Sequence, residues 1–120
     1  MSYITPFKHA LHGLGHVYAN ERSFRLQCLA TVVVLSAGLV VHLETWEFVL
    51  VILLCCSVLT LEVLNSAVEV VLDILKPRLS AQVGVAKDIM AGAVFLASVC
   101  SAIVGVLLFT PHILELIALI

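Results

Sequence analysis

Residues 89–114 read IMAGAVFLASVCSAIVGVLLFTPHIL and contain no Asp, Glu, Lys or Arg. A helix needs about 20 mostly apolar residues to cross the hydrocarbon core of a bilayer. This stretch is long enough to span a membrane with some tilt. It therefore predicts a membrane protein rather than a soluble domain.

The composition of the whole chain agrees with this prediction. The 120 residues are 62% hydrophobic and only 12% charged, with a mean hydropathy of +1.21. A soluble domain is nearer half apolar and a quarter charged, and a chain this short has too much surface to bury the excess. We expect one integral-membrane domain over residues 1–120, built entirely from α-helices.

Two further segments have the character of spans. Residues 26–41 contain no charged side chain, and an acidic connector with Trp46 as an interfacial anchor follows them. The chain is again apolar from Phe48, and Lys76-Pro77-Arg78 ends that segment because proline cannot continue a helix. The predicted spans are 26–42, 47–75 and 88–114, with a polar connector leading up to the third.

The N-terminal segment, residues 1–25, has a different pattern and lacks the apolar core of a cleavable signal peptide. Its larger apolar residues recur at steps of four, three and four: Phe7, Leu11, Leu14 and Tyr18. Lys8 and two histidines lie on another side of the same helix. This pattern predicts an amphipathic helix lying on the membrane surface. An amphipathic helix docked on protein is the alternative.

Charge placement predicts the orientation. All six basic residues lie in the N-terminal segment or the second connector: Lys8, Arg22, Arg25, Lys76, Arg78 and Lys87. Two spans separate these regions, so both must lie on the same side, which the positive-inside rule makes cytoplasmic. We expect the N-terminus inside and the C-terminus outside.

The second span carries an unusual polar stripe. Glu62, Asn65, Ser66, Glu69 and Asp73 stand at relative positions 0, 3, 4, 7 and 11, which place them on one face of a helix. Such a stripe can join helices by hydrogen bonds. Two acids on one membrane face repel each other unless a cation or a proton intervenes, so a functional site is the preferred interpretation.

The predicted orientation brings further polar residues to the same surface. Glu21 precedes the first span, and Lys87 and Asp88 precede the third. Carboxylate and amide oxygens are ligands that Mg²⁺ accepts alongside phosphates, and lysine can neutralise phosphate. The alternative to a functional role for Arg25 and Lys87 is that each only anchors the chain at the cytoplasmic surface of the membrane, as the positive-inside rule predicts.

These motifs together resemble the prokaryotic diacylglycerol kinase and undecaprenol kinase family. The likeness is carried by EVLNSAVE at 62–69, Asp73, AKD at 86–88 and NERSFR at 20–25. It extends over about residues 7–110 of the chain. Residues 90–93, MAGA, favour the undecaprenol kinase branch.

The resemblance implies a role for each site residue. Glu62 matches the base that removes the proton of a lipid hydroxyl, and Glu21 and Glu69 match carboxylates that hold Mg²⁺ on ATP. Asn65 lies beside them, and Lys87 and Asp88 match a pair that positions the nucleotide. The family also implies a homotrimeric bundle with sites between subunits.

We therefore expect an ATP-dependent lipid kinase in the bacterial cytoplasmic membrane, acting on undecaprenol or diacylglycerol in phospholipid or cell-envelope lipid-carrier metabolism. Expected partners are ATP, the lipid alcohol and membrane lipids, with no nucleic acid. The chain has no P-loop or GxGxxG motif, but the family binds ATP without either. The alternatives are an ion-coupled carrier using Glu62 and Glu69 as relays, and a non-catalytic membrane adaptor. A carrier is disfavoured because residues 26–41 and 89–114, which make up nearly all of the first and third spans, contain no acid.

Overall fold

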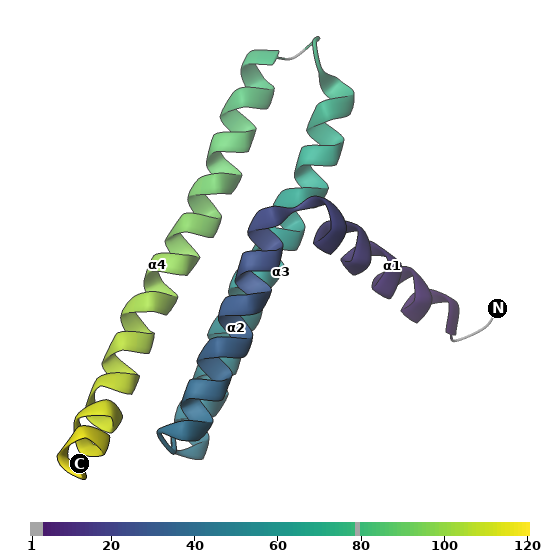
Figure 1. Cartoon of the computed structure of the whole chain (residues 1–120). Helices are drawn as coiled ribbons and strands as arrows, with labels where there is room; N and C mark the ends of the chain where they lie inside the picture. Colours follow the sequence, from purple (N-terminus) through teal and green to yellow (C-terminus); the bar gives the residue numbers. More distant parts are fainter. Residues whose placement is uncertain (1–3, 79) are drawn as a thin grey trace.

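The computed structural model describes residues 4–78 and 80–120, which fold entirely into α-helices and short connectors. The helices are α1 (Ile4–Asn20), α2 (Arg22–Val40), α3 (Thr45–Leu75) and α4 (Ser80–Ala118). Helix α3 packs against both α2 and α4, and α1 leaves the bundle at a wide angle from the point where α2 begins (Figure 1). This confirms the prediction of an all-α protein with three helices long and apolar enough to span a membrane.

A short break separates α1 from α2. Glu21 has extended backbone angles, φ −113° and ψ 107°, and ends the run of helical residues. Arg25 Nη1 donates to the carbonyls of Tyr18 (2.8 Å) and Ala19 (3.2 Å), so it satisfies acceptors at the end of α1. The rings of Tyr18 and Phe24 pack edge to face across the break. The sequence predicted that the N-terminal surface helix would extend to residue 25. The helix ends earlier, at the break, and Arg22 to Arg25 instead form the first turn of α2.

The connector from α2 to α3 is a Schellman turn. The amide of Leu43 donates to the carbonyl of Gly38 (3.1 Å), and the amide of His42 donates to that of Leu39 (3.4 Å). His42 adopts the left-handed conformation, φ 59°, that this motif requires. A Cβ at Gly38 would lie 2.9 Å from Cδ1 of Leu43, so glycine allows Leu43 to fold over the helix end.

Helix α3 starts with a capping box. The backbone amide of Glu44 donates to Oε1 of Glu47 (2.9 Å), while the Glu44 side chain accepts from the backbone at Glu47. Trp46 Nε1 also donates to Glu44 (2.7 Å). Glu47 is buried, and His112 of α4 lies 2.9 Å from it. This contact joins α4 to the first turn of α3.

The second connector is shorter than the sequence suggested. Helix α4 begins at Ser80, so Lys87 and Asp88 lie well inside a helix rather than in a polar connector. Residues 80–87 contain no proline, and adding helical residues to an existing helix gains one hydrogen bond for each residue ordered. The expectation of a connector reaching residue 87 was therefore wrong.

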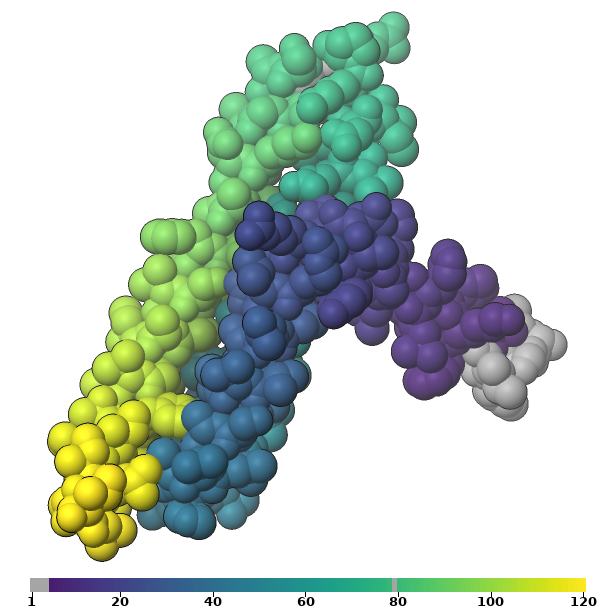
Figure 2. Space-filling model, viewed as in Figure 1, coloured from purple at the N-terminus to yellow at the C-terminus, as the bar shows by residue number. Residues whose placement is uncertain are grey.

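The long helices bury few apolar side chains within the chain. Among the described residues, the buried hydrophobic side chains are Val17, Phe24, Val51, Val58 and Val83. Most apolar side chains of α2, α3 and α4 face outward, and the space-filling view shows α1 projecting as a separate arm (Figure 2). A surface of this kind needs a lipid solvent or further protein around it.

Candidate active site

Two reciprocal hydrogen bonds join the α1–α2 break to α3. Ser23 Oγ on α2 donates to Oε1 of Glu62 on α3 (3.2 Å). Ser66 Oγ on α3 donates to Oε1 of Glu21 at the break (3.4 Å). Each side of the contact thus supplies one serine and one glutamate. The two bonds follow the antiparallel course of the helices, since Glu21 precedes Ser23 and Ser66 follows Glu62.

The α3 side of this contact is removed from solvent, whereas Ser23 on α2 is exposed in the single chain. Glu62 is 6% exposed and Ser66 is 5% exposed, whereas Glu21 is half-buried. Phe24, which is 7% exposed, packs at the same junction. A buried carboxylate is costly unless hydrogen bonds or a charge satisfy it. The hydrogen bond from Ser23 offsets part of this cost and holds the Glu62 carboxylate in place.

The polar face of α3 continues beyond Ser66. Asn65 Nδ2 lies 3.5 Å from Oε1 of Glu69, one helical turn away, and both residues are half-buried. This is a long hydrogen bond, which leaves the Glu69 carboxylate able to take other partners. Solvent exposure along this face therefore increases from buried Glu62 to exposed Asp73 near the end of the helix.

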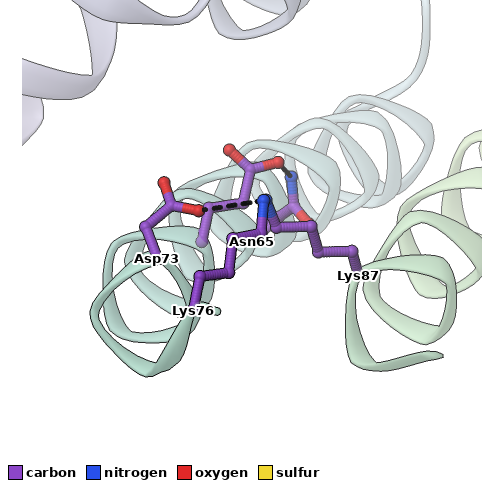
Figure 3. Close-up of polar contacts among 5 residues, drawn as sticks. Asn65, Asp73, Lys76 and Lys87 are labelled. Carbon is purple, nitrogen blue, oxygen red and sulfur yellow. Dashed lines mark hydrogen bonds and ion pairs between the residues drawn. The ribbon is translucent and has the colours of Figure 1, made fainter. Parts of the chain in front are cut away.

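Helix α4 contributes a cation to the same end of α3. Lys87 Nζ donates to Oδ1 of Asp73 (3.1 Å), and Lys76 Nζ lies 3.8 Å from the same oxygen (Figure 3). Asp88 is exposed and makes no hydrogen bond or ion pair within the described residues. The direct partner of Lys87 within the described chain is therefore Asp73 on α3.

The three glutamates of this region, unlike Asp73, have no salt-bridge partner within the described residues. Within residues 4–78 and 80–120, Glu21, Glu62 and Glu69 form no ion pair. The same residues contain no cluster of three or more His, Cys, Asp or Glu side chains able to hold a metal alone. Two carboxylates suffice for Mg²⁺ when phosphates complete the coordination. The arrangement thus suits a cation that arrives with a phosphate ligand.

An apolar cavity of about 500 Å³ lies between α2, α3 and α4. Small residues such as Ala30, Ala102 and Gly105 line it. Its wall also includes Gln27 and Val58, which stand one helical turn from Ser23 and Glu62 respectively. The cavity therefore extends from the middle of the bundle toward the buried carboxylate.

Two features of this site were absent from the sequence prediction. Ser23 had no assigned role, and Asp73 was placed on the stripe without a partner. The only indication in the sequence that Ser23 lies at the site is its position two residues after Glu21. Helical periodicity relates residues of one helix, so it could not predict a contact between Ser23 on α2 and Glu62 on α3. Both contacts depend on how α2 and α4 pack on α3.

Comparison with known proteins places this chain among lipid kinases. The family model of prokaryotic diacylglycerol kinase matches residues 8–109. A diacylglycerol kinase from Synechocystis sp. is 35% identical over 114 residues, which cover 94% of this chain and 65% of that protein. An undecaprenol kinase from Bacillus subtilis is 33% identical, with 92% of this chain and 90% of that protein covered.

A diacylglycerol kinase from Haemophilus influenzae is also 33% identical, with 88% of this chain and 92% of the relative covered. The match extends over nearly the whole chain but only about two thirds of the Synechocystis protein. The chain belongs to the prokaryotic diacylglycerol kinase family. Membership confirms the resemblance inferred from the motifs and, with it, the enzyme class of lipid kinase.

Proposed function

We propose that this chain transfers the γ-phosphate of ATP to the hydroxyl of a membrane lipid alcohol, undecaprenol or diacylglycerol. The observation that carries the proposal is the gathering of Glu21, Glu62 and Glu69 at one region of an apolar bundle, without a salt-bridge partner in the described chain. Ionisable groups inside membrane proteins usually mark functional sites. The names of the relatives support the same reaction.

Glu62 is the proposed base. Its carboxylate takes the proton of the lipid hydroxyl while the lipid oxygen attacks the γ-phosphorus of ATP. The bond from the γ-phosphorus to the β–γ bridging oxygen breaks, and ADP leaves. The burial of Glu62 and the hydrogen bond that it accepts from Ser23 support this role, because a base must be held within reach of its proton.

Glu21 and Glu69 are the proposed Mg²⁺ ligands, with Asn65 beside them. Ser66 supports this assignment, because its hydroxyl contacts Glu21 and it lies three residues before Glu69 on α3. Bound Mg²⁺ would neutralise phosphate charge during transfer. Lys87 and Asp88 are proposed to position the nucleotide, and the location of Lys87 one turn beyond the level of Glu69, at Asp73, agrees with this role.

The cavity supports a lipid as the acceptor. Its lining is mostly apolar. The lining includes Val58, one helical turn from Glu62, and Gln27, one helical turn from Ser23. A hydrocarbon chain in this space would bring a terminal hydroxyl toward the base without exposing apolar surface to water.

We further propose a homotrimer in the bacterial cytoplasmic membrane, with shared sites and α1 on the cytoplasmic surface. Phe7 and Leu11 of α1 are 66% and 56% exposed, which suits insertion into a lipid interface. The open polar face of α3, with half-buried Asn65 and Glu69, supports cover by a neighbouring chain. Labelling of single cysteines, in a background without the four native ones, should find position 82 on the cytoplasmic side and position 44 outside. Labelling of both from one side would exclude three spans.

The decisive experiment offers the purified protein labelled ATP with diacylglycerol and undecaprenol in parallel. We expect Mg²⁺-dependent labelling of at least one lipid, and the ratio of the two rates identifies the substrate. A well-folded protein that labels neither lipid in a suitable bilayer or micelle would refute the proposed reaction.

A further inference from the structure

We propose that Ser23 is a positioning residue for Glu62, holding one carboxylate oxygen so that the other is directed to the lipid hydroxyl. The inference rests on the proposed kinase function. Its starting point is the 3.2 Å hydrogen bond from Ser23 Oγ to Oε1 of Glu62, which crosses from α2 to α3. Glu62 Oε2 accepts no hydrogen bond within the described residues and is the oxygen left for substrate.

The hydrogen bond of Ser23 differs from those of three of the other four hydroxyls that donate a hydrogen bond within the described residues. Three hydroxyls donate to the carbonyl four residues earlier in their own helix: Thr31 to Gln27, Ser57 to Leu53, and Thr110 to Val106. That is the usual local bond of serine and threonine in a helix. Ser23 and Ser66 instead donate to carboxylates that are far away in the sequence.

A specific feature of the break explains why Ser23 reaches across. The residue four positions earlier is Ala19, whose carbonyl accepts a hydrogen bond from Arg25 Nη1 (3.2 Å). The helix is also interrupted at Glu21, so Ser23 stands in the first turn of α2 rather than within a continuous helix. The break therefore separates Ser23 from the carbonyl four positions earlier, and its hydroxyl is available to Glu62.

Positioning matters at Glu62 because a glutamate side chain has three rotatable bonds. A base that samples several rotamers spends little time at the productive one, and a small displacement lowers the rate strongly. A hydrogen bond to Oε1 restricts the carboxylate to the orientation that packing already favours. Ser23 contacts neither reacting atom and acts through Glu62.

The same junction provides an internal contrast. Ser66 makes the corresponding contact to Glu21, the proposed Mg²⁺ ligand. Removing each hydroxyl should therefore change a different kinetic constant. Ser23→Ala should lower kcat, whereas Ser66→Ala should weaken the apparent affinity for Mg²⁺. A general loosening of the junction would instead change both constants in both variants.

The test compares Ser23→Ala, Ser23→Thr and a matched control, Ser57→Ala, in the full-length protein. Ser57 is exposed on α3 and bonds only to its own helix, so its removal should leave kinetics unchanged. We expect Ser23→Ala to lower kcat about tenfold, with the KM for MgATP changed less than about twofold. Ser23→Thr keeps the hydroxyl and should recover most of the lost turnover.

Wild-type kcat in Ser23→Ala, or equal loss in Ser23→Ala and Ser23→Thr, would overturn the positioning role while leaving the kinase function intact. Should Ser23→Ala fail to fold, Ser23→Cys takes its place, because a thiol is nearly isosteric but a weak donor. Reduced kcat in Ser23→Cys with a normal KM supports the role, and full turnover removes it. A wild-type protein that labels neither lipid defeats the proposed function itself.

Discussion

Lys87 on α4 lies 3.1 Å from the carboxylate of Asp73 on α3, at the end of the bundle where the two helices are connected. Lys76 lies 3.8 Å from the same carboxylate. Asp73 is one helical turn beyond Glu69, so it holds two cations next to the proposed metal ligands. An exposed ion pair of this kind contributes little to stability. We interpret it as placing Lys87 for nucleotide phosphates.

The first prediction concerns this pair. Asp73→Asn should raise the KM for MgATP several-fold, because Lys87 loses the carboxylate that orients it, while the thermal midpoint stays nearly unchanged. Steady-state kinetics at saturating lipid would measure the effect. Lys76→Gln is the control and should have the smaller effect, since its contact is longer. A lower KM in Asp73→Asn would mean that Asp73 competes with phosphate for Lys87.

The second prediction separates the two acids of the α3 stripe. Glu62→Gln keeps the shape of the buried side chain but removes the base, so kcat should fall about a hundredfold or more with MgATP affinity retained. Glu69→Gln should weaken the apparent affinity for Mg²⁺. Titrations of Mg²⁺ and ATP on both variants test this, and equal loss of nucleotide binding in both would contradict the division of roles.

The third prediction concerns assembly. The apolar side chains of α2–α4 are mostly exposed in one chain, and the Asn65–Glu69 face is only half-covered. Neighbouring chains should cover this polar face, because leaving it in lipid is costly. Native mass spectrometry of the active protein in detergent should find three copies. A fully active monomer would rule out the trimer.

The fourth prediction concerns the turn after α2. His42 holds a left-handed conformation (φ 59°) that is unfavourable for residues with a Cβ. His42→Gly should therefore stabilise the protein, by about 0.5–1 kcal/mol. Gly38→Ala should destabilise it, since the new Cβ would lie 2.9 Å from Leu43 and 3.1 Å from Phe48. SDS-induced unfolding in mixed micelles measures both, and stabilisation by Gly38→Ala would refute this description of the turn.

The fifth prediction concerns the opposite end of the bundle. His112 lies 2.9 Å from the buried carboxylate of Glu47, so His112→Leu leaves that carboxylate without its partner on α4. The thermal midpoint should fall. The KM for MgATP should not change, because the contact is remote from Glu69 and Lys87 along the helices. A changed KM with an unaltered midpoint would show that this contact acts on the site rather than on stability.

Several properties follow from the sequence alone. The uncharged run at 89–114 and the composition determine an all-helical membrane protein, because the polar groups of the backbone must be hydrogen-bonded internally in lipid. The 3.6-residue period places Glu62, Asn65, Ser66 and Glu69 on one face of α3 wherever that helix packs. The motifs at 20–25, 62–69 and 86–88 were sufficient to identify the family.

Only the tertiary structure decides which of these side chains meet. Ser23 reaches Glu62, Ser66 reaches Glu21, and Lys87 reaches Asp73 because α2 and α4 pack on α3 in a particular register. The start of α4 at Ser80 also follows from helix continuity rather than from the polarity of residues 80–87. Periodicity describes one helix at a time. The distances between helices are set by side-chain packing and by where each helix is interrupted, as at Glu21.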